Sequence, residues 1–262
     1  MKISMMSTVM MNYPPEEIVK TAAKCRMAGI DWVTEHGSTA KKLRKLCDDA
    51  GLPTVVHTPV YEFVPWTVKK FIEKFKRSVE FASVLGAPVM MIPVRQIGFG
   101  SRELDRAQWI EAFAQAAPIA KKAGITLTFE AMGFALAPVK SAAECLQVLS
   151  AVPELRITFD SGNVETVENP IVSYCKLADK VVHVHLKDFL RTAEPSGPNA
   201  FQALNRFYYR QVLFGEGGSD LETLWRAMKG HGYQGYVNFE TCSDKMPPQK
   251  FLKILCDRMR NW

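Results

Sequence analysis

The sequence lacks the features that mark membrane-bound, secreted and nucleic-acid-binding proteins. None of its apolar stretches is long enough to span a bilayer, so we expect no membrane partner. Its six cysteines lie far apart without a C-x-x-C pair, which favours buried, reduced thiols in a cytoplasmic protein. The basic residues behind the net charge of +6 are spread over helix-like segments and form no arginine-rich block, so we expect no nucleic-acid partner.

The chain also lacks linkers and low-complexity stretches. Its apolar start, MKISMMSTVMM, is short and contains Ser4, Ser7 and Thr8, so we interpret it as a first strand and not as a signal peptide. A length of 262 residues suits one large α/β barrel. We therefore expect a single domain over residues 1–262.

Strand-like and helix-like patterns alternate from one end of the chain to the other. The expected strands are Lys2–Met6, Ile30–Glu35, Thr54–His57, Pro88–Val94, Thr126–Ala131, Arg156–Asp160, Lys180–Lys187 and Tyr236–Thr241. A helical pattern follows each of them, which predicts a parallel sheet with crossover helices. Eight such units predict a single (β/α)8 TIM barrel, with a doubly wound sheet as the structural alternative.

Four of the expected strands end on side chains that bind metals in other proteins. The strands are TLTFE, RITFD, VVHVH and YVNFE, and the end residues are Glu130, Asp160, His185 and Glu240. Three carboxylates and one imidazole form a set that suits Mn²⁺, Mg²⁺ or Zn²⁺. Acidic residues also start loops after many barrel strands, and a single one would indicate nothing more. Four together favour a buried metal site at the mouth of the barrel.

A polar residue lies two positions before each of these four ends, and the residue between them is apolar. The polar residues are Thr128, Thr158, His183 and Asn238. Alternate residues of a strand share a face, so we expect this polar layer to point into the barrel below the metal site. There it should hydrogen-bond to the ligands or within itself. We interpret His183 as part of this layer and not as a ligand.

One connection is much longer than the others. About thirty residues, Asp188 to Gly218, separate the seventh strand from its helix. Loops of this length in compact domains are usually lids or binding loops. Because barrel active sites form at the carboxyl ends of the strands, this loop at about 188–218 should leave the face that carries the metal site. Two glycine-rich segments, 98–101 and 215–219, are each either a phosphate cradle or a plain turn.

Six motifs resemble those of the xylose isomerase-like barrel superfamily. They are VVHTPVY at 55–61, FEAMG at 129–133, TFDSGN at 158–163, HVHLKD at 183–188, GEGGSDLETLW at 215–225 and NFETC at 238–242. The resemblance extends over essentially the whole chain. The superfamily contains sugar and sugar-phosphate isomerases and epimerases, inosose dehydratases, 3-dehydroshikimate dehydratases and endonuclease IV.

In ketose 3-epimerases of this superfamily, four residues bind one divalent cation and two glutamates act as acid and base on the substrate. The resemblance implies that Glu130, Asp160, His185 and Glu240 bind the cation and that Glu130 and Glu240 are catalytic. We expect Mn²⁺ first, with Mg²⁺, Zn²⁺ or Co²⁺ as alternatives.

Four further residues are candidates for contact with the substrate. The resemblance implies this role for His57, for Asn163, which stands where many members have histidine, and for Arg191, six residues after His185. Lys187 lies near the expected mouth of the barrel, where it is either a substrate contact or a solvated lysine.

These features predict an enzyme of carbohydrate metabolism, a divalent-metal-dependent isomerase or epimerase. A cation that bridges a ketone and the neighbouring hydroxyl stabilises an enediolate, and return of the proton then gives epimerisation or isomerisation. We expect a keto-sugar or sugar phosphate as substrate. The alternative is a dehydratase or lyase on a keto-sugar, an inosose or dehydroshikimate, since loss of a β-hydroxyl from the same intermediate is dehydration.

Two other functions are disfavoured. Tyr209-Arg210-Gln211 occupies the place of two zinc ligands of endonuclease IV, and the fourth strand, VMMIPV, lacks an expected histidine, which argues against DNA repair. An intact ligand set argues against a non-catalytic partner subunit. The oligomeric state, including a homo-oligomer, stays open.

Overall fold

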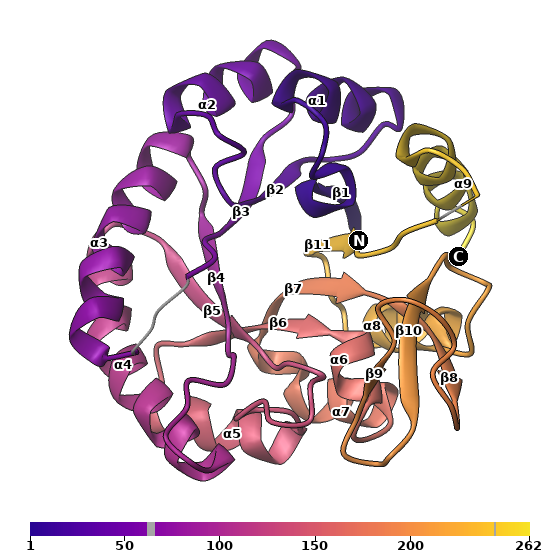
Figure 1. Ribbon diagram of the computed structural model, residues 1–262. Coiled ribbons are helices and arrows are strands. Elements are labelled where there is room, and N and C mark those ends of the chain that lie inside the picture. The colour runs from indigo at the N-terminus through magenta and orange to yellow at the C-terminus, as the bar shows by residue number, and fades with distance from the viewer. Residues whose placement is uncertain (62–65, 244) are drawn as a thin grey trace.

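The computed structural model describes residues 1–61, 66–243 and 245–262, and its central feature is a closed barrel of parallel strands (Figure 1). The order around the barrel is β1-β11-β7-β6-β5-β4-β3-β2. The strands are β1 (Lys2–Met6), β2 (Ile30–Val33), β3 (Thr54–Thr58), β4 (Val89–Pro93), β5 (Thr126–Glu130), β6 (Arg156–Asp160), β7 (Val181–Leu186) and β11 (Tyr236–Phe239). The predicted (β/α)8 TIM barrel is confirmed.

Helices surround the barrel and connect its strands (Figure 1). They are α1 (Pro15–Lys24), α2 (Ala40–Asp49), α3 (Val68–Leu85), α4 (Arg102–Lys122), α5 (Ala142–Ala151), α6 (Ser161–Glu165), α7 (Pro170–Leu177), α8 (Leu221–Gly230) and α9 (Pro248–Met259), with the short 3-10 turns Ser7–Met10 and Ala178–Lys180. At several helix starts, a side chain such as Thr39 or Ser141 accepts a hydrogen bond from the backbone N–H three residues later. Within the described residues, none of the helices is long and apolar enough to cross a membrane.

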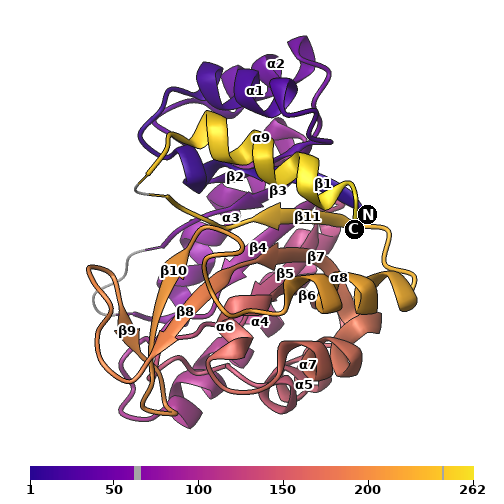
Figure 2. The ribbon, with the colours of Figure 1, turned by 90° about the vertical axis from the view of Figure 1, so that its right-hand side faces the viewer.

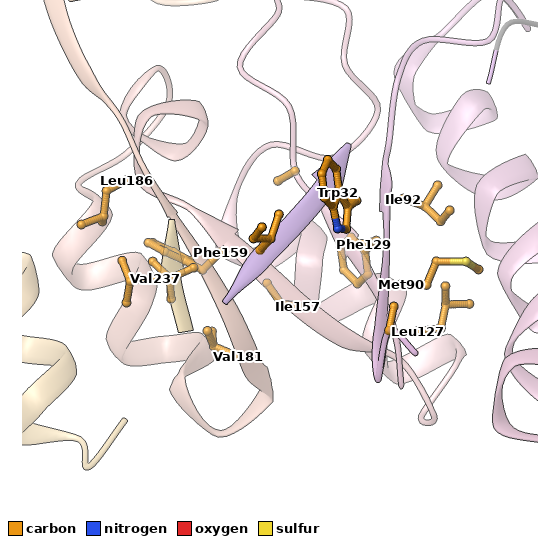
Figure 3. Packing of buried hydrophobic residues seen from close by; sticks show 14 of the residues in the cluster. Trp32, Met90, Ile92, Leu127, Phe129, Ile157, Phe159, Val181, Leu186 and Val237 are labelled. Carbon is orange, nitrogen blue, oxygen red and sulfur yellow. The ribbon is translucent and has the colours of Figure 1, made fainter. Parts of the chain in front are cut away.

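The hydrophobic core lies between the strands and the helices, and it fixes the direction of every strand side chain. Phe129, Phe159 and Phe239 are buried and point outward into this layer, and Figure 3 shows Phe129 and Phe159 among their neighbours. The ring of Phe113, on α4, lies 5.9 Å from that of Phe129. Because side chains alternate along a strand, the residues on either side of these phenylalanines point into the barrel.

The segment expected as one long loop contains a small antiparallel sheet. Its strands are β8 (Asp188–Thr192), β9 (Phe201–Gln202) and β10 (Tyr208–Val212), in the order β8-β10-β9. The aromatic rings of Phe189, Phe201 and Tyr209 pack together within this sheet. In Figure 2, β9 lies on the side of the molecule opposite the two chain termini.

Candidate metal centre

The four strand-end residues meet on one side of the barrel mouth. Glu130 ends β5, Asp160 ends β6, His185 lies near the end of β7 and Glu240 follows β11. One ligand atom from each of them lies within 4.8 Å of those of the other three. Glu130, Asp160 and His185 are buried, whereas the Glu240 side chain keeps 25% of its surface exposed. We call these residues the ligand cluster.

The two ring nitrogens of His185 face different partners. Nδ1 lies 2.8 Å from Glu130 Oε1, 3.9 Å from Glu240 Oε2 and 4.0 Å from Asp160 Oδ2. Nε2 lies 3.2 Å from Oδ2 of Asp31, a buried residue of β2. A hydrogen bond from Nε2 to this carboxylate fixes the ring with Nδ1 toward the cluster, which is the arrangement that orients histidine ligands in metal sites. The proton that Nδ1 shares with Glu130 must leave before this nitrogen binds a metal.

The two carboxylate oxygens of Asp160 have different partners. Oδ1 accepts a hydrogen bond from the Asn163 backbone N–H at 2.8 Å and caps α6. Oδ2 is buried and accepts no well-formed hydrogen bond from any residue that the structure describes, although Lys187 Nζ lies 2.9 Å away as an ion pair. Buried oxygens of this kind are rare in native proteins. A cation would satisfy this oxygen, so the cluster fits a divalent metal ion.

The electrostatics of the cluster show how strongly its charges interact. Burial raises the pKa of Asp160 to about 7; Lys187 opposes this shift, while Glu130 and Glu240 add to it. Burial also disfavours ionised Glu130, but the hydrogen bond and charge of His185, together with Lys187, lower its pKa below the usual range. Burial disfavours charged His185 too, yet Asp31 and Glu130 raise its pKa well above the usual value. Without a metal, the cluster therefore retains a proton on the imidazole that a cation would replace.

The polar layer below the cluster is buried and hydrogen-bonded. Thr128 Oγ1 and Thr158 Oγ1 lie 2.8 Å apart. Asn238 Nδ2 lies 3.0 Å from His183 Nε2, and Ser4 donates a hydrogen bond to Asn238 Oδ1. The members of the layer bond to one another inside the barrel, as the alternation of the strands predicts.

Asp31 links the polar layer to the cluster, and the sequence pattern does not single it out. Its Oδ2 accepts a hydrogen bond from Asn238 Nδ2 at 2.7 Å and lies 3.4 Å from His183 Nε2, besides its contact with His185. Burial raises the pKa of Asp31, but the hydrogen bonds of His183 and His185 outweigh this effect, and the pKa lies below its usual range. The available signal is a lone acidic residue in an otherwise apolar strand, IDWV.

The four predicted substrate contacts divide into two pairs. Lys187 is buried within the cluster, with its Nζ 3.0 Å from Glu240 Oε1, so the alternative of a solvated lysine is wrong. Asn163 lies beside it, with its Oδ1 3.5 Å from Lys187 Nζ.

The second pair lies away from these contacts. His57 points outward from β3, with Nδ1 3.1 Å from the Trp32 carbonyl oxygen and its ring 4.9 Å from that of Phe81 on α3. Arg191 is exposed on β8, and its guanidinium lies 5.1 Å from the centre of the Phe207 ring. Contact of these two residues with a substrate stays a prediction.

Both glycine-rich segments already hold a carboxylate of the chain. The N–H groups of Ile97, Gly98 and Phe99 donate to Asp105 at 2.7–3.2 Å. Those of Gly215, Gly217 and Ser219 donate to Asp188 at 2.7–3.1 Å. The amides that would cradle a phosphate are therefore occupied, and the plain-turn alternative is the one that the structure supports.

Fold and site together define a TIM barrel with a buried His/Asp/Glu site at its mouth. The chain matches the model of the xylose isomerase-like TIM barrel family over residues 20–262, and it belongs to that family. No curated protein matches the chain in sequence.

Solved structures with a similar fold include proteins of several functions. The 3-keto-D-glucoside 4-epimerase YcjR from E. coli, in its apo form, is 15% identical, with 100% of both chains covered and a TM-score of 0.75. The probable 3-DHS dehydratase AsbF involved in petrobactin synthesis, from Bacillus anthracis, is 16% identical, with coverage of 100% of this chain and 99% of that chain and a TM-score of 0.78. The IOLI protein with a binding zinc atom is 15% identical, with coverage of 100% and 97% and a TM-score of 0.80. At these identities the similarity shows the fold alone.

Proposed function

We propose that this protein is a divalent-metal-dependent isomerase or epimerase that transfers a proton next to the ketone of a sugar or sugar phosphate. The observation that carries the proposal is the convergence of three carboxylates and His185 Nδ1 within 4.8 Å, with the buried Asp160 Oδ2 in contact with a cationic group, the Lys187 ammonium. Oxygen ligands with one imidazole suit Mn²⁺, and also Mg²⁺, Zn²⁺ or Co²⁺. The bound zinc of the IOLI protein shows that a protein of similar fold binds a metal.

The two glutamates of the cluster are the candidates for proton transfer. When bound, a divalent cation polarises a ketone and stabilises the negative charge that develops as the neighbouring carbon loses its proton. Glu130 and Glu240 extend from β5 and β11, which are separated by β6 and β7 in the order of the barrel. Two carboxylates so placed flank a substrate held between them. One removes the proton and the other returns it on the opposite face, which is epimerisation.

The remaining residues position the reacting groups. Asp31 holds the His185 ring through Nε2, and the Asn163 N–H holds the Asp160 carboxylate through Oδ1. The Lys187 ammonium lies beside Glu240 and Asp160, where it also stabilises negative charge on a substrate oxygen.

The same site also supports the alternative, a dehydratase. Removal of the proton by Glu130 or Glu240 followed by loss of a β-hydroxyl is dehydration. The similarity to the probable dehydratase AsbF keeps this outcome in the test, although it extends to the fold alone.

Tyr209 and Gln211 stand at the positions where endonuclease IV would have its extra zinc ligands. Asn205 donates a hydrogen bond to the Tyr209 hydroxyl at 2.7 Å, and Gln211 donates to the Glu240 carbonyl oxygen at 2.5 Å. Neither side chain offers a carboxylate or imidazole to a metal. We expect no metal-dependent incision of abasic DNA.

Solvent exchange in D₂O tests the proposal. The Mn²⁺-loaded protein should place deuterium on the carbon next to the ketone of its substrate, while Glu130→Gln and Glu240→Gln should lose turnover by roughly 10²–10⁴-fold. Metal occupancy is measured in each variant, because loss of the metal would mimic loss of the acid or base. The matched control is Glu222→Gln, on the exposed face of α8, which should keep full turnover.

The products distinguish the candidate reactions. An epimerase or isomerase gives an isomeric sugar, whereas a dehydratase releases water and an unsaturated or diketo product that absorbs in the ultraviolet. If the loaded protein shows neither exchange nor elimination on free and phosphorylated keto-sugars, inososes and dehydroshikimate, the proposed proton transfer is wrong.

A further inference from the structure

The Lys187 ammonium occupies the same part of the structure as the ligand cluster. Its Nζ lies 2.9 Å from Asp160 Oδ2 and 3.0 Å from Glu240 Oε1, two carboxylates of the proposed ligand set. The lysine is 6% exposed, so its charge is compensated by these side chains and not by solvent. Lys187 therefore acts as the counter-ion of the cluster when no metal is bound.

Two neighbouring residues on α6 fix the position of the Lys187 side chain. The Lys187 backbone N–H donates to the Ser161 hydroxyl at 3.1 Å, which fixes the start of the side chain. Gly162 lies against the aliphatic part. A Cβ atom at position 162 would lie 2.6 Å from Lys187 Cβ and 3.1 Å from its Cδ, so a larger residue would displace the side chain.

A divalent cation and this ammonium compete for the same oxygens. Cation ligands in proteins lie about 2.0–2.6 Å from the ion, so a metal bound to Asp160 Oδ2 and Glu240 would approach the ammonium closely. Like charges at such a distance repel strongly in a buried site. The lysine stem is flexible, and Nζ already donates a long hydrogen bond of 3.5 Å to Asn163 Oδ1.

We propose that Lys187 holds the cation position in the metal-free protein and leaves it when a divalent ion binds. The lysine then stabilises the cluster in the metal-free protein and lowers its affinity for metal, so that binding of the ion is coupled to movement of the ammonium toward Asn163. This inference rests on the proposed metal-dependent function, because it assumes that the cluster binds the ion.

Titration of metal-stripped protein with Mn²⁺ in a calorimeter tests this inference. Lys187→Met keeps the aliphatic stem and removes the charge, so the Kd for Mn²⁺ should fall by at least about tenfold, since the repulsion between like charges is lost. The melting temperature of the metal-free variant should fall, while that of the Mn²⁺-loaded variant should not. The matched control is Lys180→Met, an exposed residue at the other end of β7, which should change neither quantity.

Each outcome of the titration decides a separate question. An equal or weaker affinity in Lys187→Met overturns the inference and leaves the proposed function standing. Absence of Mn²⁺ binding to both the natural chain and the variant contradicts the proposed function as well. If Lys187→Met does not fold without metal, Lys187→Gln, which keeps a polar end without the charge, is titrated in its place, and the same increase in affinity is required.

Discussion

Asp160 and Asp188 are two buried aspartates at the mouth of the same barrel, but their carboxylates accept different numbers of hydrogen bonds. Asp188 begins β8 and accepts three backbone N–H groups, from Gly215, Gly217 and Ser219, so both of its oxygens are satisfied. Asp160 ends β6 and accepts one N–H, from Asn163, while its Oδ2 faces the ligand cluster. Burial alone therefore does not distinguish a structural carboxylate from a functional one. The number of backbone N–H groups that donate to its oxygens does.

Other buried aspartates extend the same comparison. Asp105 resembles Asp188, since the N–H groups of Ile97, Gly98 and Phe99 donate to its carboxylate. Asp31 is satisfied by side chains instead, and two of them are the histidines of β7. We infer that Asp105 and Asp188 hold loops, that Asp31 orients a ligand and that Asp160 is a ligand.

Replacement of Asp160 by asparagine should have the largest effect, and the quantity that changes should be the affinity for the metal. Asp160→Asn keeps the acceptor for the Asn163 N–H and removes the charge on the cluster side. Loss of a residue that only orients a ligand lowers metal affinity by roughly 100-fold at most. Loss of a ligand itself should cost more, so the affinity of Asp160→Asn for Mn²⁺ should fall by more than about 100-fold. Calorimetric titration measures it. An Asp160→Asn variant that keeps the natural Kd would break the distinction between the two aspartates.

The same exchange at Asp188 should act on stability instead. Asp188→Asn leaves three partly buried N–H groups around one neutral acceptor, so the free energy of unfolding should fall by about 1–3 kcal/mol. Urea denaturation measures this change. Asp160→Asn in its metal-free form loses the ion pair with Lys187, but it also removes a carboxylate whose pKa burial raises to about 7, so it should lose less stability than Asp188→Asn. The opposite ranking would contradict the comparison.

Asp31→Asn should have a smaller effect on metal affinity than Asp160→Asn. The amide holds the His185 ring without the negative charge that keeps the proton on Nε2, so the Kd for Mn²⁺ should rise roughly 10–100-fold. The control, Asp179→Asn at an exposed position, should leave the Kd unchanged. An unchanged Kd in Asp31→Asn would show that Asp31 serves the fold and not the ligand.

The hydroxyl pair of the polar layer should give the smallest effect. Thr128 and Thr158 bond to each other inside the barrel, so Thr128→Val removes the Thr158 hydroxyl's partner and should cost about 1 kcal/mol of unfolding free energy. Thr158→Val should cost less, because the Thr128 hydroxyl keeps its 3.4 Å hydrogen bond to the Met90 carbonyl oxygen. The double variant should cost less than the sum of the single ones, since neither partner is then left behind. Strict additivity in urea denaturation would show that the pair is not coupled.

The local features of the fold and the cluster could be predicted because they depend on neighbouring residues. The bounds of β1 and β6 agree with the expected Lys2–Met6 and Arg156–Asp160. Apolar residues such as Phe129 and Phe159 lie between polar ones, and this alternation with a period of two predicts which side chains share the barrel interior. Because the carboxyl ends of parallel barrel strands lie at the same mouth, the proximity of the four end residues could be predicted from the strand pattern alone.

The remaining features depend on contacts between distant parts of the chain. Asp31 bonds to Asn238, 207 residues away, and nothing near either residue indicates that contact. The glycine-rich segment 215–219 is typical of a phosphate cradle, but its backbone N–H groups donate to Asp188, at the other end of the long connection. Arg191 pairs with Tyr209 in the register of β8 and β10, and its guanidinium lies over the ring of Phe207. This contact depends on how the two strands pair, so the position of Arg191 six residues after His185 could not predict it.

Anomalous diffraction from a crystal soaked in Mn²⁺ tests the central claim most directly. The account predicts one manganese ion per chain, within about 2.0–2.6 Å of Glu130, Asp160 Oδ2, His185 Nδ1 and Glu240, with Asp188 still bonded to its three backbone N–H groups. An ion bound at Asp31 and His183 instead, or no ion at the cluster in saturating Mn²⁺, would contradict it.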